Sequence, residues 1–341
     1  MALTAGLNTL FKITGRQKIQ RNSITRIVCV KLDEIGDMVS AVNVFAELKL
    51  AFPNAKIDVL CKPFVKSLIE FDPNVDRILL NSNDLGKYDV WVELRGNWNT
   101  LFKSIWSTGC FRADRGTVRF KQRGNQAHES VTNYRVIESI IRHFCEKTGP
   151  QELPLMPKLF AHNSHKDLAA KRLIELGVTG NFVVIHPAAR KSLRQWPPHR
   201  FSQITEYLWN EHRLYSVVVG TKDESNILKE IEGNKSYVKT LISEDSLLVL
   251  HEMIRNSVFF IGNESGPLQI ANVTGKPVIG LFGPGVKNVF YPNQNSASVV
   301  LHRVLDCNPC DQINCVKSEP CINLISTAEV ILAIESVLST K

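Results

Sequence analysis

Three carboxylates lie close together after the first apolar stretch of the chain. Residues 27–32 read IVCVKL and predict a buried strand, and Asp33, Glu34 and Asp37 follow it. In a parallel sheet, the loop at the carboxyl end of a strand exposes functional groups. A carboxylate in such a loop can take the proton of a bound hydroxyl group as a general base. Alternatively, Asp37 caps or neutralises the N-terminus of the helix that follows.

A second candidate site is a turn between two apolar runs. Val258–Ile261 and Pro277–Phe282 predict buried strands, and a short helix over Leu268–Val273 is expected between them. The turn at residues 262–266, GNESG, brings glycines to the start of this helix, where backbone N–H groups lack partners and attract anions. An ordinary strand–helix–strand turn without a ligand fits the same residues equally well.

Two basic segments offer further sites for anions. Arg190, Lys191 and Arg194 follow a predicted strand at residues 181–187. The other segment is punctuated by glycines and therefore predicts a mobile loop that holds phosphate or carboxylate groups of a ligand. Its basic residues are Arg112, Arg115, Arg119, Lys121 and Arg123. Charged runs are more often simply solvated, and that interpretation stays open.

Four of the eight cysteines are clustered near the end of the chain, in the pattern C-x2-C-x4-C-x5-C. They are Cys307, Cys310, Cys315 and Cys321. Four thiolates in a short loop suit tetrahedral ligation, which predicts a structural zinc site, with a disulfide pair or free thiols as the alternatives. The scattered remaining cysteines are typical of buried thiols in a reducing compartment.

Length and composition indicate a globular protein of two domains. The 341 residues exceed one typical core, and 44% hydrophobic with 22% charged residues are globular values. No apolar run approaches the ~18 residues of a membrane-spanning helix, and no secretory signal is evident, so we expect a cytoplasmic protein. The net charge of +8 favours anionic partners such as nucleotides, phosphorylated glycolipids or an anionic membrane. No nucleic-acid-binding motif occurs, and nucleic acid is not an expected partner.

The chain is expected to comprise a basic tail, two domains and a linker. The tail, residues 1–23, has leucines at helical spacing followed by basic residues, which fits an amphipathic segment on the inner-membrane surface; a frayed basic tail is the alternative. Strands alternate with helices over residues 24–150 and 166–341, which predicts doubly wound parallel sheets. Residues 151–165 read as a proline-containing linker, and the second domain includes the Cys-rich segment 307–321.

Three motifs resemble glycosyltransferase family 9, the lipopolysaccharide heptosyltransferases. They are V-K-L-D-E-I-G-D-M-V at residues 30–39, a strand ending in H-P with R-Q-W-P at residues 194–197, and G-N-E-S-G-P-L-Q-I-A with G-K-P-V-I-G-L-F-G-P within residues 262–284. The motifs occur in the family's order, and the resemblance extends from about Arg26 to about Val337. It implies the GT-B fold, in which two Rossmann-like domains face a central cleft.

The resemblance also implies the reaction and the site. The implied reaction is transfer of a sugar with inversion, most simply heptose from ADP-heptose to a lipopolysaccharide-core acceptor. The sequence has no Asp-x-Asp, the usual motif for a metal that binds the diphosphate, so no catalytic metal and no cofactor are expected. Asp37 matches the family's catalytic base, and Arg194, reinforced by Lys191, matches the residue that contacts the donor phosphates. The remaining donor-binding positions are Glu264, Ser265, Gly266, Pro267, Leu268 and Gln269. The basic segment between Arg112 and Arg123 would bind the acceptor.

Two positions depart from the family pattern. Glu264 stands where the family has Asp, and Gln269 where it has His. Both positions contact the nucleotide sugar in the family, so one alternative is a related transferase that uses another nucleotide sugar. The other alternative is a non-catalytic nucleotide-sugar-binding or scaffold protein, against which the retention of Asp37 and Arg194 argues.

Overall fold

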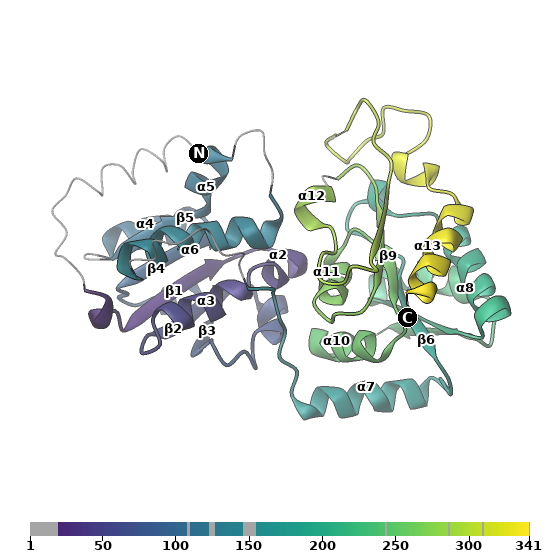
Figure 1. The fold of residues 1–341 in the computed structure, drawn as a ribbon, viewed down its shortest axis with the longest axis horizontal. Coiled ribbons are helices and arrows are strands. Elements are labelled where there is room, and N and C mark those ends of the chain that lie inside the picture. Colours follow the sequence, from purple (N-terminus) through teal and green to yellow (C-terminus); the bar gives the residue numbers. More distant parts are fainter. Residues whose placement is uncertain are drawn as a thin grey trace. The chain divides into compact units, whose positions relative to one another are not determined.

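The computed structural model describes residues 20–107, 110–122, 127–145, 155–242, 244–285, 287–308 and 310–340. The chain separates into two compact units, Met1–Phe160 and Ala161–Lys341, each built around one parallel sheet with helices packed on it (Figure 1). The predicted linker spans this division, and the described residues 155–162 form neither helix nor strand. The predicted tail lies outside the described residues up to position 19.

The first unit contains the following helices and strands: β1 (Arg26–Lys31), α2 (Ile35–Val39), α3 (Asn43–Ala51), β2 (Lys56–Cys61), β3 (Arg77–Leu79), β4 (Val90–Arg95), α4 (Trp98–Trp106), β5 (Phe111–Asp114), α5 (Arg115–Lys121) and α6 (Glu129–Cys145). Short 3-10 turns are η1 (Arg21–Ser23), η2 (Pro63–Leu68) and η3 (Ser82–Asp84).

The second unit contains α7 (Asn163–Glu175), β6 (Phe182–His186), α8 (Pro198–His212), β7 (Tyr215–Gly220), α9 (Ser225–Glu232), β8 (Val238–Ile242), α10 (Leu247–Asn256), β9 (Phe260–Asn263), α11 (Gly266–Asn272), β10 (Val278–Phe282), α12 (Lys287–Phe290), β11 (Val299–His302) and α13 (Thr327–Ser339). Its 3-10 turns are η4 (Ser192–Arg194), η5 (Lys222–Glu224) and η6 (Cys321–Leu324).

Both sheets are wound in the same way. The first has the order β3-β2-β1-β4-β5 and the second β11-β10-β9-β6-β7-β8, and the neighbouring strands pair in parallel among the described residues. In each, the winding reverses beside the first strand, between β1 and β4 and between β6 and β9. Ligands of such sheets bind outside the carboxyl ends of the strands at this switch point. The predicted doubly wound α/β class is therefore confirmed, and two candidate sites follow from topology alone.

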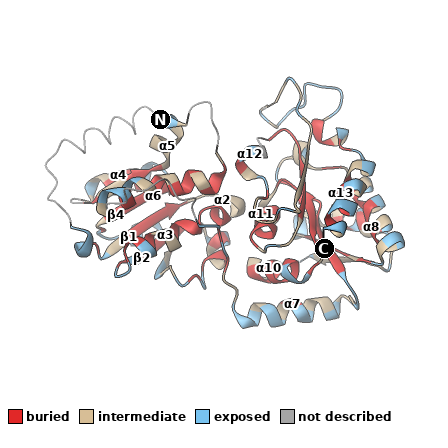
Figure 2. Ribbon diagram, in the orientation of Figure 1, coloured by how far each residue is buried: buried red, intermediate tan, exposed pale blue. Residues whose placement is uncertain are grey.

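The central strands are buried on both faces. All of β6 is buried, and β1 is buried from its second residue onward, as the red strands of Figure 2 show. Their near-continuous runs of Val and Ile suit a parallel sheet covered by helices on both sides. The last helix, α13, begins with a capping box of Ser326 and Glu329 and buries Val330, Ala333, Ile334 and Val337.

The prediction of a mobile loop over the basic segment was wrong. Residues 111–114 form β5, and α5 follows immediately. Asp114 explains the difference, because its carboxylate accepts hydrogen bonds from the backbone N–H and the hydroxyl of Thr117 and so caps the helix. Between β2 and β3 the chain forms the 3-10 turn η2, which begins at Pro63. No described helix is long and apolar enough to cross a bilayer.

Candidate active site

Asp37 lies at the switch point of the first sheet. Lys31 ends β1, the acidic loop follows, and Asp37 falls in the first turn of α2. Its side chain is half-buried and accepts no hydrogen bond from any described residue, so it does not cap the helix, although its place in the first turn fits the alternative in which it neutralises the helix N-terminus. Burial raises the pKa of the Asp37 carboxyl; Lys31 and Arg115 act to lower it, and the carboxylates of Asp33 and Glu129 act to raise it.

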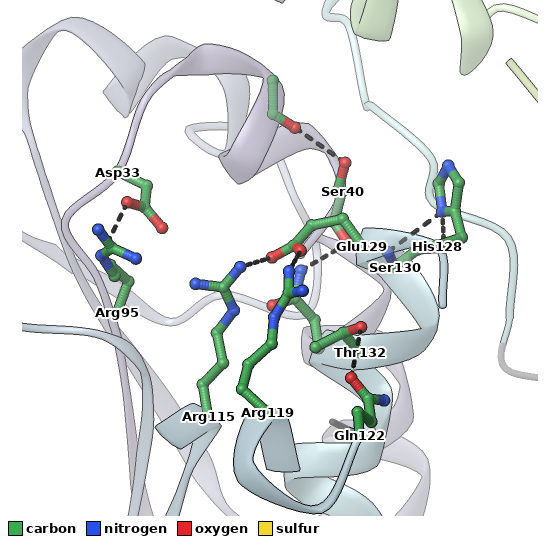
Figure 3. A network of polar contacts seen from close by, with 12 residues as sticks. Asp33, Ser40, Arg95, Arg115, Arg119, Gln122, His128, Glu129, Ser130 and Thr132 are labelled. Atoms are coloured by element: carbon green, nitrogen blue, oxygen red, sulfur yellow. Dashed lines mark hydrogen bonds and ion pairs between the residues drawn. The ribbon is translucent and has the colours of Figure 1, made fainter. Parts of the chain in front are cut away.

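A buried ion network acts electrostatically on this carboxylate, and Figure 3 shows its members Glu129, Arg115 and Arg119. Glu129, at the start of α6, is completely buried and binds Arg115 at 2.5 Å through Oε1 and Arg119 at 2.6 Å through Oε2. Lys31 is also completely buried, with its Nζ 3.0 Å from Asp33 and 3.9 Å from Glu129. Because each buried charge has opposite charges beside it, the network can persist in the interior. It joins β1, α5 and α6.

This network places the predicted acceptor-binding residues in different surroundings. Arg115 and Arg119 are tied to Glu129, while Arg112 lies on β5 with its Nε and Nη1 buried without a hydrogen-bond partner among the described residues. Lys121 ends α5 and is exposed. Arg123 lies outside the described residues. The role of Glu129 is not evident from the sequence, because its partners lie 10 and 14 residues away on another helix.

The second switch point gathers the loop after β6 and the loop after β9. Arg194, on η4, approaches Glu264 with Nη1 at 3.3 Å from Oε1, and Ser265 Oγ lies 3.2 Å from His186 Nδ1. Trp196 is fully buried, and its ring nitrogen donates to the carbonyl of Ile325, which fixes the end of the Arg194 loop. Two predicted motifs separated by about seventy residues in sequence are thus brought together by parallel pairing.

Glu264 is a buried carboxylate with unused hydrogen-bonding capacity. Its Oε2 has no hydrogen-bond partner among the described residues, and burial raises the pKa of its carboxyl against the opposing effect of Arg194. The glycine at position 285 lies against it, because a Cβ built there would come within 2.2 Å of Oε2. A buried acceptor without a partner is costly, so this oxygen is suited to receive a ligand hydroxyl.

The other predicted donor-binding residues differ in how far their side chains are accessible to a ligand. Ser265, Gly266 and Pro267 are half-buried, whereas the side chains of Leu268 and Gln269 are buried. The Gln269 amide donates to the carbonyl of Phe290 at 2.7 Å, so in this structure it anchors the segment after β10. Only backbone groups of Leu268 remain for a ligand, and contact of Gln269 with a nucleotide sugar stays a prediction.

Two cations of the Arg194 loop, Lys191 and Arg194, contact the Cys-rich segment. Lys191 Nζ donates to the carbonyl of Asp311 at 2.9 Å, and Arg194 Nε donates to Gln312 Oε1 at 2.7 Å. Gln312 has a φ of 63°, a left-handed conformation that is unfavourable for a residue with a side chain. These two contacts link Lys191 and Arg194, which are predicted to bind the donor phosphates, to a turn with a strained backbone.

Glu224 is a further charged group at the same edge. It lies on η5 beyond the carboxyl end of β7, and its Oε2 is 3.8 Å from His186 Nε2. Burial acts to raise the pKa of this carboxyl, but His186 and the backbone N–H of Thr221 outweigh it and lower the pKa to about 2. The available signal in the sequence was the position of Glu224 in the stretch TKDES, directly after an apolar run.

The four clustered cysteines line a common pocket with Leu193, Asn308 and Asn314. They are free thiols, and burial raises the pKa of Cys321. Among the described residues, no group of three or more His, Cys, Asp or Glu side chains is arranged to hold a metal ion. The four thiols therefore lie around one pocket, but their arrangement is not that of a metal-binding site. Structural zinc stays a prediction.

Comparison with known proteins agrees with the sequence motifs. Residues 87–320 match the sequence model of glycosyltransferase family 9 (heptosyltransferase). Lipooligosaccharide heptosyltransferase 2 of Campylobacter jejuni subsp. jejuni is 23% identical over 324 residues, which cover 90% of this chain and 96% of the relative.

Two solved structures resemble the whole chain. A family 9 glycosyl transferase from Veillonella parvula has a TM-score of 0.78 at 17% identity, covering 96% of this chain and 100% of that one. The ADP-heptose lipopolysaccharide heptosyltransferase II of E. coli has a TM-score of 0.73 at 17% identity, covering 93% and 99%. At this identity both bear on the fold alone, and they confirm the predicted GT-B class of paired Rossmann-like units.

Proposed function

Because the chain belongs to glycosyltransferase family 9, we propose that it transfers heptose from ADP-heptose to a lipopolysaccharide-core acceptor with inversion at the anomeric carbon. The proposal rests on the side chains that lie at the two switch points. The first holds a half-buried carboxylate that accepts no hydrogen bond from the described residues, and the second holds Arg194 beside a buried carboxylate. The reaction requires both a base and a cation.

In the proposed reaction, Asp37 takes the proton of the acceptor hydroxyl. The oxygen attacks the anomeric carbon from the side opposite the diphosphate, and the bond between that carbon and the diphosphate oxygen breaks. Arg194 and Lys191, with backbone N–H groups at residues 265–268, stabilise the charge left on the ADP leaving group. The unpartnered oxygen of Glu264 accepts a hydrogen bond from a hydroxyl of the donor sugar. No metal or cofactor takes part in these steps.

The donor is tested by titrating the purified protein calorimetrically with ADP-heptose and with ADP-, GDP-, UDP- and dTDP-linked hexoses. Selective binding of ADP-heptose is the expected result. Preference for another nucleotide sugar would favour the second candidate function, a related transferase, for which the buried Glu264 and the internally bonded Gln269 are the specific observations. Absence of binding to every donor would favour a scaffold protein.

We propose further that the protein works at the cytoplasmic face of the inner membrane, because its acceptor would be anchored in that membrane. Transfer should persist in excess EDTA, since no step uses a metal. The Cys-rich segment would hold structural zinc if its thiolates close around the ion, which metal analysis of the purified protein tests. Zinc at one equivalent that is lost in a Cys315→Ser variant would support the site, whereas no bound metal would exclude it.

A further inference from the structure

Helix α4 of the first unit exposes a row of aromatic side chains. Trp98, Phe102 and Trp106 are spaced four residues apart, so they share one face of the helix. Their exposed fractions are 66%, 55% and 81%. The rings of Trp98 and Phe102 lie 6.4 Å apart. We refer to these three residues as the α4 aromatic row; pale blue sections of α4 in Figure 2 mark exposed residues.

The helix that presents this row is firmly anchored. Asn97 and Thr100 form a reciprocal capping box at its start, and Thr100 also donates to the buried carboxylate of Glu93 at 2.9 Å. Leu101 and Ser104 are buried on the opposite face. The aromatic row is therefore held outward by the packing of the helix, and it costs free energy in water because the rings stay hydrated.

The net charge of the first unit favours an acidic partner. From Arg95 to Phe111 the sequence has no Asp or Glu, and α4 itself carries Lys103. Residues 1–160 contain 23 of the 41 Lys and Arg residues and 16 of the 33 Asp and Glu residues, a net charge of +7, which leaves +1 for residues 161–341. Positive charge is thus concentrated in the unit that exposes the aromatic row.

We propose that the α4 aromatic row is the surface by which the protein binds an anionic lipid bilayer. Trp is suited to the boundary between headgroups and acyl chains, because its ring is apolar and its N–H can stay hydrated. The excess of basic residues in the same unit is attracted to acidic headgroups. The inference rests on the proposed function in one respect, since an enzyme with a lipid-anchored acceptor has to work at a membrane.

The test is sedimentation of the full chain with vesicles of phosphatidylethanolamine and phosphatidylglycerol, and with vesicles of phosphatidylcholine. The wild type should bind the anionic vesicles more tightly, and rising salt should weaken that preference. A triple variant, Trp98→Ser, Phe102→Ser and Trp106→Ser, should lose at least tenfold in affinity. Its matched control, Ile174→Ser with Leu332→Ser, removes apolar side chains that are 76% and 69% exposed in the second unit and should bind like the wild type.

Three further measurements make the outcome decisive. Brominated lipids should quench the tryptophan fluorescence of the wild type but not that of a Trp98→Phe, Trp106→Phe variant. Thermal unfolding shows whether the triple variant is folded, and transfer to a deacylated acceptor should be unchanged, which separates this inference from the proposed function. Unchanged vesicle binding by the triple variant overturns the inference. The inference is also overturned if the wild type is a dimer and the triple variant a monomer. The same holds if vesicle binding is lost only when residues 2–19 are deleted.

Discussion

The carboxyl of Asp37 titrates among charged neighbours that come from several elements. Lys31 belongs to β1, Asp33 to the following loop, Arg115 to α5 and Glu129 to α6. Burial dominates and raises the pKa of Asp37. We therefore expect kcat/KM to fall with decreasing pH along an acid limb above about 4, the ordinary value for Asp. Initial rates measured across pH test this, and an acid limb at or below the ordinary value would contradict it.

Replacing Asp37 separates catalysis from binding. Asp37→Asn should lower kcat by about 10²–10⁴-fold and leave the Kd for the donor unchanged, because the base is lost but the donor contacts remain. A raised folded-state pKa means that ionising Asp37 costs stability as pH rises through that pKa, so the variant should have a higher Tm than the wild type at neutral pH and lose this advantage in acid.

The matched control for this variant is Glu34→Gln. Glu34 lies on the same loop and pairs with Lys62 at 2.9 Å, with side chains that are 44% and 36% exposed, so its loss should change neither kcat nor Tm appreciably. An Asp37→Asn enzyme that turns over at the wild-type rate would remove Asp37 from the mechanism.

Glu129 should contribute strongly to stability. Glu129→Ala would leave Arg115, Arg119 and Lys31 without their buried partner, and we expect the free energy of unfolding to fall by about 3–5 kcal/mol. Glu138→Ala on the same helix removes only an i,i+4 ion pair with the half-exposed Arg142 and should cost less than about 0.5 kcal/mol. Urea denaturation of both variants measures the difference. Equal, small effects would show that the network is not stabilising.

At the scale of elements, the contact between η4 and the Cys-rich segment predicts opposite effects of one substitution. Gln312→Gly removes the side chain that holds Arg194 and also relieves the left-handed backbone conformation. The KM for the donor should rise roughly tenfold, equivalent to about 1.4 kcal/mol, while stability stays equal or increases. Steady-state kinetics and thermal unfolding measure the two effects.

The exposed Ser318 in the same segment provides the control, since Ser318→Gly should alter neither quantity. A lower donor KM in Gln312→Gly would reverse the interpretation, because it would mean that Gln312 occupies the place of the donor phosphates rather than positioning Arg194.

The elements were predictable where their signals are local. Apolar runs identified the central strands, and the motifs placed Asp37, Arg194 and Glu264 at strand ends, which parallel pairing then brought to the switch points. Helix α5 was not predicted, because the glycines of this segment indicated a loop, whereas the carboxylate of Asp114 caps a helix there. The contact of Arg194 with Gln312 could not be predicted, since 118 residues separate them and no sequence period relates them.

For the whole molecule, the two units hold different parts of the proposed chemistry. The first contains Asp37, the buried network and the excess of basic residues, and the second contains Arg194, Lys191 and Glu264. The repeated winding of both sheets explains this division, because each supplies one switch point where side chains can meet a ligand. Transfer would therefore require both units, whereas donor binding would depend on residues of the second.

The most direct test of the proposed activity is a transfer assay with ADP-heptose and heptose-deficient lipopolysaccharide, followed by mass spectrometry of the lipid product and measurement of released ADP. The proposal predicts that the acceptor gains the mass of one heptose residue for each ADP released, and that Asp37→Asn releases almost none. Transfer from a different nucleotide sugar with none from ADP-heptose, or an unimpaired Asp37→Asn enzyme, would contradict it.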